Sequence, residues 1–114
     1  MLPESDIQTV QAWIDNRNSG IRADIRDQIR YEFDTSPHAV TIFDCRPPWK
    51  PELGPDWTRL IVAQLRFTVV GNLWSLYWRD SSEVFHPYFE FNARPDVGDL
   101  LAEIDRDPTA IFWG

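Results

Sequence analysis

Three runs of alternating polar and apolar residues, the first of them long, fill the second half of the chain and constrain its fold most. They span residues 57–69, 73–79 and 84–91, with turns at Gly71-Asn72 and Asp80-Ser81-Ser82 between them. A period of two places successive side chains on opposite faces of a β-strand. Because turns this short join antiparallel neighbours, the pattern predicts three consecutive strands of a meander.

Two more strands and two helices complete the predicted fold. Residues 25–33 alternate, residues 39–45 are rich in β-branched and aromatic side chains, and a turn at residues 34–38 joins them. Apolar residues at helical spacing predict helices over residues 5–16 and 96–106. The apolar end, residues 110–114, is expected to pack down as an edge strand. The sum predicts an α+β fold: an antiparallel sheet of about five strands, flanked by an N-terminal and a C-terminal helix packed on one face.

The size and composition of the chain bound its class. With 114 residues and 43% hydrophobic content, we expect a single globular domain spanning residues 1–114. No apolar run approaches the ~20 residues of a membrane span, which excludes an integral membrane protein. The opening Met1-Leu2-Pro3-Glu4-Ser5-Asp6 is acidic where a signal peptide is basic, so we expect a cytoplasmic protein.

Charge, cysteine and histidine content argue against a nucleic-acid partner, an internal disulfide and a metal site. The net charge of −7 disfavours a nucleic-acid partner, because proteins that track phosphate backbones are usually basic. Cys45 is the single cysteine, so no internal disulfide is possible. His38 and His86 lie far apart in the sequence. We therefore expect no metal site and no cofactor.

The alternation assigns side chains to two sheet faces. One set is almost wholly apolar and should pack on the helices: Ile61, Ala63, Leu65, Phe67, Trp74, Leu76, Trp78, Phe85, Pro87 and Phe89. The other combines Gln64, Arg66, Ser75, Tyr77, Arg79, His86 and Tyr88, with Arg30 and Glu32 from the first strand. Tyr and Arg dominate recognition sites, which favours a binding surface over an ordinary solvated face. A single bulge would flip part of this assignment.

A proline-rich connection adds one more candidate contact. Residues 46–56 hold four prolines, and proline cannot donate to a sheet ladder. We expect a stiff, extended segment that presents Trp49 at modest entropic cost. The predicted partner-binding or ligand-binding residues are Arg66, Tyr77, Arg79, His86, Tyr88 and Trp49; no catalytic residue is assigned. Ion pairs with Glu32, Glu83 or Glu90 are an equally good explanation of Arg66 and Arg79.

Several strings occur together in this chain. They are Cys45-Arg46-Pro47-Pro48-Trp49, Gly54-Pro55-Asp56-Trp57-Thr58, Ala63-Gln64-Leu65-Arg66-Phe67, Leu73-Trp74-Ser75-Leu76-Tyr77-Trp78-Arg79-Asp80, Phe85-His86, and the ending from Ile104-Asp105-Arg106-Asp107-Pro108 to Phe112-Trp113-Gly114. With them, roughly residues 25–114 resemble a family of small bacterial proteins known only as a domain of unknown function. The resemblance implies a compact family domain and no activity, substrate or catalytic residue.

Three functions fit these observations. The first is a non-enzymatic binding or accessory module, whose Arg/Tyr/His face holds a protein partner or a small anionic ligand. The second is a small RNase-like enzyme, in which His86 with Tyr77 or Tyr88 moves protons and Arg66 and Arg79 stabilise phosphorane charge. The third is a homodimeric scaffold that buries the polar face.

Overall fold

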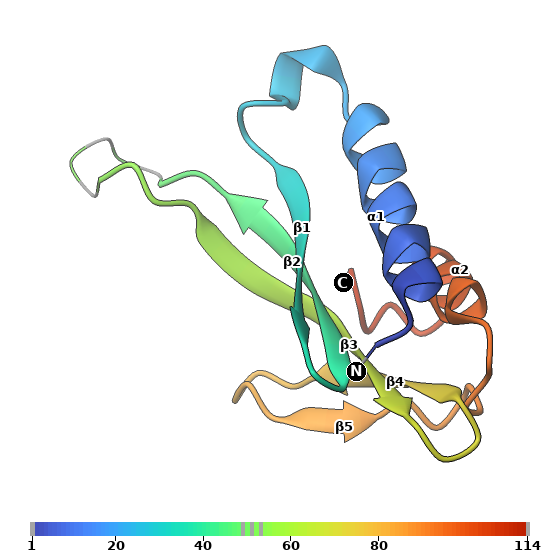
Figure 1. The fold of residues 1–114 in the computed structure, drawn as a ribbon. Coiled ribbons are helices and arrows are strands. Elements are labelled where there is room, and N and C mark those ends of the chain that lie inside the picture. Colours follow the sequence, from blue (N-terminus) through green and yellow to red (C-terminus); the bar gives the residue numbers. More distant parts are fainter. Residues whose placement is uncertain (1, 49, 51, 53, 114) are drawn as a thin grey trace.

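The computed structural model describes residues 2–48, 50, 52 and 54–113. In chain order, one α-helix precedes the five strands and a second follows them (Figure 1). The elements are α1 (Glu4–Ser19), a 3₁₀ turn (Ala23–Ile25), β1 (Arg30–Ser36), β2 (Ala39–Arg46), β3 (Thr58–Thr68), β4 (Leu73–Arg79), β5 (Phe85–Pro87) and α2 (Val97–Arg106). The α+β order predicted from the sequence is confirmed.

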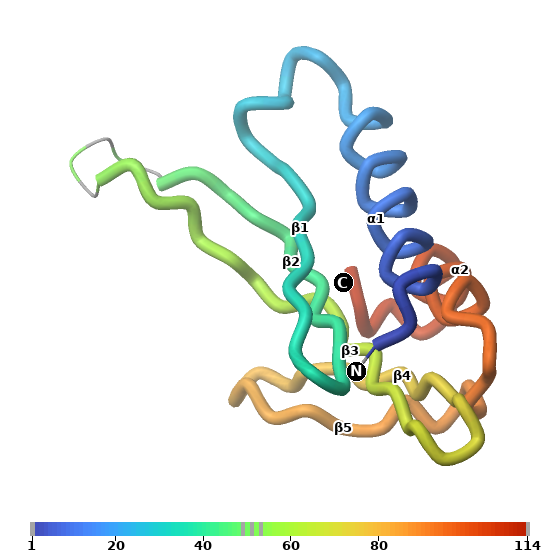
Figure 2. Tube along the Cα trace, in the orientation of Figure 1, coloured from blue at the N-terminus to red at the C-terminus, as the bar shows by residue number. Residues whose placement is uncertain are grey.

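The five strands form one antiparallel meander in the order β1-β2-β3-β4-β5. Both helices pack on the same face of this sheet, and the ends of β2 and β3 remote from the helices project from the body of the molecule (Figure 2). None of the helices in the described ranges combines the length and the hydropathy needed to cross a bilayer.

The core lies between that face and the helices. Val10 and Ile14 of α1 and Leu100 of α2 meet the sheet there. At its centre Trp74 is fully buried, and its indole Nε1 donates a hydrogen bond of 2.9 Å to Asp6 Oδ2 on α1. A buried indole N–H needs such an acceptor, so this bond fixes the first turns of α1 against β4.

A β-bulge in β3 changes the predicted face of its first half. Ala63 pairs with Ile42 and Ile61 pairs with Phe43, which leaves Val62 as the extra residue. Val62 and Ala63 are therefore both buried, although they are neighbours. The expectation that Ile61 shares the core face with Ala63 is wrong, because the extra residue inverts the alternation before it.

The predicted faces of the fifth strand are reversed. Directly opposite residues of an antiparallel pair share a face, and the register pairs Trp78 with His86 and Arg79 with Phe85. His86 thus lies on the side of Trp78. The strand is also shorter than predicted, since Pro87 ends it. The chain then leaves β4 after Tyr88 and returns at Arg94, whose backbone exchanges hydrogen bonds of 2.7 and 2.9 Å with Trp74.

The start of β1 and the C-terminal segment also differ from the prediction in detail. β1 begins at Arg30 and not at Ile25, because Ala23–Ile25 form a 3₁₀ turn and residues 26–28 a further turn. The terminal segment packs down, as expected, but as turns and not as a strand. Phe112 is buried, and the Asp107 carboxylate accepts hydrogen bonds from the N–H groups of Phe112 and Trp113 at 3.0 and 2.9 Å.

Candidate functional site

The sheet face turned away from the helices, which we call the open face, carries polar and aromatic side chains. Its register places Glu32 beside Phe43 and Gln64 beside Tyr77. Two arginines on it are held by carboxylates. Arg59 bonds to Asp34 at 2.9 and 3.1 Å, and Arg30 lies 2.7 Å from Glu32. The Arg59 hydrogen bonds lower the pKa of Asp34. This part of the open face is internally neutralised.

Arg66 is held differently, by a group that we call the Arg66 cluster: Gln64, Arg66, Tyr77 and Phe85. The guanidinium carbon lies 3.9 Å from the centre of the Tyr77 ring and 5.6 Å from that of Phe85. Arg66 Nε donates to Gln64 Oε1 at 2.7 Å, which leaves the two Nη groups for other acceptors. Gln64 is oriented in turn by donating to Thr41 at 3.0 Å.

No carboxylate approaches Arg66 within salt-bridge distance in residues 2–48, 50, 52 and 54–113. The aromatic contacts and the amide orient the guanidinium without neutralising its charge. Of the two readings left open for Arg66, the ion pair with Glu32 or Glu90 is thus absent from the described structure.

Arg79 lies in a different environment. Its Nη1 is 3.6 Å from Glu83, and the Arg79 side chain is only 20% exposed. Together with Val62, Phe112 and Trp113 it lines a hollow of about 310 Å³ beside the terminal segment. The structure therefore does not group Arg79 with the Arg66 cluster, and the predicted pairing with Glu83 is present.

His86 is engaged within the β4–β5 hairpin. Its ring lies 4.7 Å from that of Trp78, and Nε2 is 2.6 Å from Asp80 Oδ2. The other Asp80 oxygen accepts N–H bonds from Ser82 and Val84. The His86 hydrogen bond, followed by that of Val84, lowers the pKa of the Asp80 carboxyl. His86 thus helps to close the turn and lies on the face opposite Tyr77.

Tyr88 is a core residue and not a surface residue. It is 2% exposed, its ring lies 5.1 Å from that of Phe112, and its hydroxyl donates to Glu103 of α2 at 3.0 Å. Burial, and then the Glu103 hydrogen bond, raises the pKa of the phenol. The expectation that Tyr88 and His86 join Arg66 on one face is wrong. The pairing of β5 with β4 places His86 on the side of Trp78, and Tyr88 faces α2. Trp49 lies outside the described residues.

The model of one sequence family matches residues 2–114; its description is "Domain of unknown function (DUF3024)". The chain belongs to this family. No curated protein and no solved structure matches it. The resemblance noted over residues 25–114 is confirmed, and it extends through α1.

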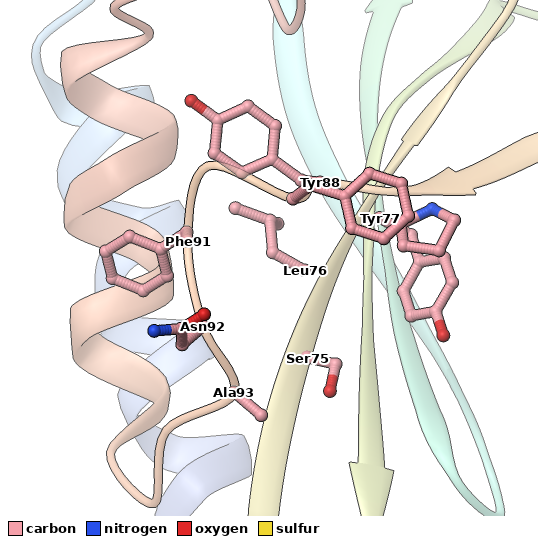
Figure 3. Close-up of a pocket in the computed structure, with 9 residues that line it drawn as sticks. Ser75, Leu76, Tyr77, Tyr88, Phe91, Asn92 and Ala93 are labelled. Atoms are coloured by element: carbon pink, nitrogen blue, oxygen red, sulfur yellow. The ribbon is translucent and has the colours of Figure 1, made fainter.

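Sequence reasoning missed two aromatic residues of this DUF3024 domain. Phe85 and Phe89 were assigned to the core, whereas Phe85 lies beside Arg66 and Phe89 is 85% exposed. Phe89 lines a shallow hollow of about 210 Å³ with Ser75 and Tyr77. Figure 3 shows the Tyr88 ring turned toward the helices, away from Ser75. Nothing local in the sequence signals this reversal, because both alternating sets carry aromatic rings, Phe85 and Phe89 in one and His86 and Tyr88 in the other.

The arrangement separates the groups that an RNase-like reaction would need together. Arg66 and Tyr77 lie on the open face, while His86 shares a face with Trp78 and Tyr88 is buried against α2. What the open face offers is Arg66, an oriented guanidinium that, unlike Arg30 and Arg59, has no carboxylate partner within the described residues. Such a group recognises a carboxylate or another planar anion.

Proposed function

We propose that this DUF3024 domain is a non-enzymatic binding module that holds a protein partner on its open face, with Arg66 bonding a carboxylate of that partner. One observation carries the proposal: Arg66 is oriented by Tyr77 and Gln64, yet has no carboxylate within the described residues. An arginine held in its bound rotamer loses little further entropy on binding.

The surroundings of Arg66 favour a protein partner over a small anion. The hollow beside Tyr77 holds about 210 Å³, below the ~300–1,000 Å³ typical of small-molecule sites. Phe89, by contrast, exposes most of its ring next to that hollow. An arginine stacked on a half-buried tyrosine, with exposed Phe89 at the hollow beside that tyrosine, is typical of an interface hot spot. The partner thus supplies a carboxylate and an adjoining apolar side chain.

The net charge limits how acidic the partner is. At −7, the domain repels a polyacidic segment at long range. A segment with one carboxylate flanked by apolar residues keeps the contact with Arg66 and avoids most of that repulsion. This chemistry distinguishes the expected partner from nucleic acid and from an acidic tail.

A displayed library of random dodecapeptides tests the proposal. Peptides selected on the wild-type protein should carry one Asp or Glu next to an aromatic or aliphatic residue. Arg66→Gln should weaken their binding by about tenfold or more, since it removes a charged hydrogen-bonding partner. Arg22→Gln is the matched control, because Arg22 is an exposed arginine that pairs with Asp24 away from this face. Equal binding by Arg66→Gln and wild type would overturn the proposal.

Self-association through the open face is the competing prediction. Light scattering measures the oligomeric state of the wild type and of Arg66→Gln. If the wild type is a dimer and Arg66→Gln a monomer, the open face binds a second copy of the chain. If the wild type is a monomer and Arg66→Gln weakens peptide binding, the binding-module proposal is supported.

A further inference from the structure

The outer edge of β1 is open along part of its length. Among the described strands β1 lies at the edge of the sheet and has β2 as its single neighbour, and Ser36 pairs with Ala39 at the hairpin turn. The backbone of Tyr31 turns away from β2: its N–H donates to Asn18 Oδ1 at 2.8 Å, and its C=O accepts from Asn18 Nδ2 at 2.9 Å. In an antiparallel pair, every second residue directs its backbone groups the same way. Phe33 and Thr35 therefore also point outward.

Nothing in the described ranges bonds to those outward groups of Phe33 and Thr35. At Tyr31, in contrast, the Asn18 side chain supplies both a donor and an acceptor. Its carboxamide is chemically a peptide group, held where the next strand's peptide group would lie. Asn18 thus takes the place of an adjoining strand at Tyr31. Nearer the turn, the outward backbone groups of Phe33 and Thr35 have no partner in the described ranges.

Two hollows follow this edge between β1 and α1. One, of about 290 Å³, is lined by Ile14 and Asn18 on the helix and by Tyr31 and Phe33 on the strand. The other, of about 600 Å³, lies further along, where Leu2 and Ile7 face Thr35, Ser36 and Pro37. Because both lie between the same two elements, they mark a groove that runs beside the vacant part of the edge.

We propose that this groove binds an extended peptide segment of a partner protein, which adds to β1 as a further strand. The backbone of the segment bonds to Phe33 and Thr35. The added strand stops before Tyr31, because Asn18 already bonds to the outward backbone groups of that residue. Strand addition of this kind takes its affinity from main-chain hydrogen bonds and its specificity from the pockets for alternate side chains.

The lining of the groove defines the segment's side chains. Leu2 and Ile7 present an apolar wall, so an aliphatic residue faces that end. Glu4 and Asp15 are exposed on the helix rim, and Asp15 adjoins the strand hollow. The peptide is accordingly neutral or basic, unlike the carboxylate-bearing segment expected at Arg66. The two surfaces are separate, and this inference stands without the function proposed above.

A matched pair of variants at Thr35 tests the inference. Thr35→Pro removes the outward N–H without removing a bond to β2, and edge strands tolerate proline at such positions. Thr35→Val keeps the N–H. Decapeptides selected from a displayed random library on the wild-type protein serve as probes. We expect enrichment of alternating sequences that contain Lys or Arg, about tenfold weaker binding to Thr35→Pro, and unchanged binding to Thr35→Val and to Arg66→Gln.

Hydrogen exchange in the wild-type protein gives a second measurement that does not depend on a variant that folds. The amides of Phe33 and Thr35 should exchange more slowly when a selected peptide is bound, while the Tyr31 amide, already bonded to Asn18, should change little. The inference is overturned if no library peptide protects Phe33 and Thr35, or if Thr35→Pro and Thr35→Val bind equally. A β1-to-β1 dimer that Thr35→Pro dissociates would also overturn it, because the occupant would be a second copy of the chain.

Discussion

The guanidinium carbon of Arg17 lies 4.1 Å from the centre of the Trp113 ring. The same group faces Tyr31 at 4.7 Å, and its Nη1 lies 2.6 Å from Asp105. Trp13 donates to the other Asp105 oxygen at 2.9 Å. One arginine of α1 therefore contacts β1, α2 and the terminal segment at once, joining elements that are far apart in the sequence.

Replacing Arg17 should destabilise the domain more than replacing an ordinary surface arginine. Its side chain is 24% exposed and loses several aromatic contacts together with the bond to Asp105. We expect Arg17→Ala to lower the free energy of unfolding by about 2 kcal/mol, with Arg22→Ala, at 77% exposure, changing it by less than about 0.5 kcal/mol. Urea unfolding monitored by tryptophan fluorescence measures both. Equal effects would show that the Arg17 contacts contribute nothing.

The bond between Trp74 and Asp6 should be measurable separately from the packing of the indole. Trp74→Phe keeps a large ring but leaves the Asp6 carboxylate without its donor, and should cost about 1–3 kcal/mol. Trp74→Ala also opens a cavity in the core and should cost about 3–5 kcal/mol. Chemical denaturation of both variants tests the ranking. A Phe variant as stable as the wild type would contradict the role given to the indole N–H.

The hydroxyl of Tyr88 should matter where that of Tyr77 does not. Tyr88→Phe leaves buried Glu103 without the phenol donor, so we expect a loss of about 1–2 kcal/mol. Tyr77→Phe is the matched control on the open face and should change stability by less than about 0.5 kcal/mol. Thermal unfolding of the two variants side by side measures the difference. Reversal of this order would contradict the assignment of Tyr88 to the core.

Acidification should weaken the β4–β5 hairpin through Asp80. The pKa of this carboxyl is lowered in the folded state from its ordinary value of 3.8, mainly by the His86 hydrogen bond. The stabilisation is therefore fully present above the unfolded-state pKa and is lost as the pH falls through the lower, folded-state pKa. Asp80→Asn should reduce stability at neutral pH, and the gap to the wild type should narrow below about pH 4.

Urea unfolding of the wild type and Asp80→Asn from neutral pH to pH 3 checks this expectation. Asp15→Asn is a comparison variant on an exposed helix position, where the carboxylate contacts the Gln11 amide. A gap that stays constant across the range would show that Asp80 does not titrate with folding.

The parts of the fold that follow from local sequence were predicted well. The alternation in residues 73–79 gave the bounds of β4, and the stripe with Leu100, Leu101 and Ile104 placed α2 between its prolines. Both patterns depend on neighbours within a few positions. Local periodicity is enough to identify such elements, and the short turns then determine the meander.

The errors arose where pairing between strands overrides local alternation. Val62 looks like any strand residue, and only its opposition to the Ile42–Phe43 pair makes it a bulge. In residues 85–89 the alternation is present but its two faces are exchanged, because the pairing with β4 puts His86 opposite Trp78 and Phe85 opposite Arg79. Arg66 was placed correctly because its half of β3 follows the bulge. What singles Arg66 out is that no carboxylate in the described part of the chain lies near it, and this depends on tertiary structure.

The burial of Cys45 makes the domain convenient for spectroscopy. It is the single cysteine, and it is fully buried in β2. Burial, and then the Glu32 carboxylate, raises the pKa of its thiol. A thiol that stays protonated and covered reacts poorly with maleimides. A cysteine introduced at exposed Asn92, which lines the hollow beside Tyr77, would therefore take a fluorescent dye selectively and report on occupancy of the open face without any change to the native thiol.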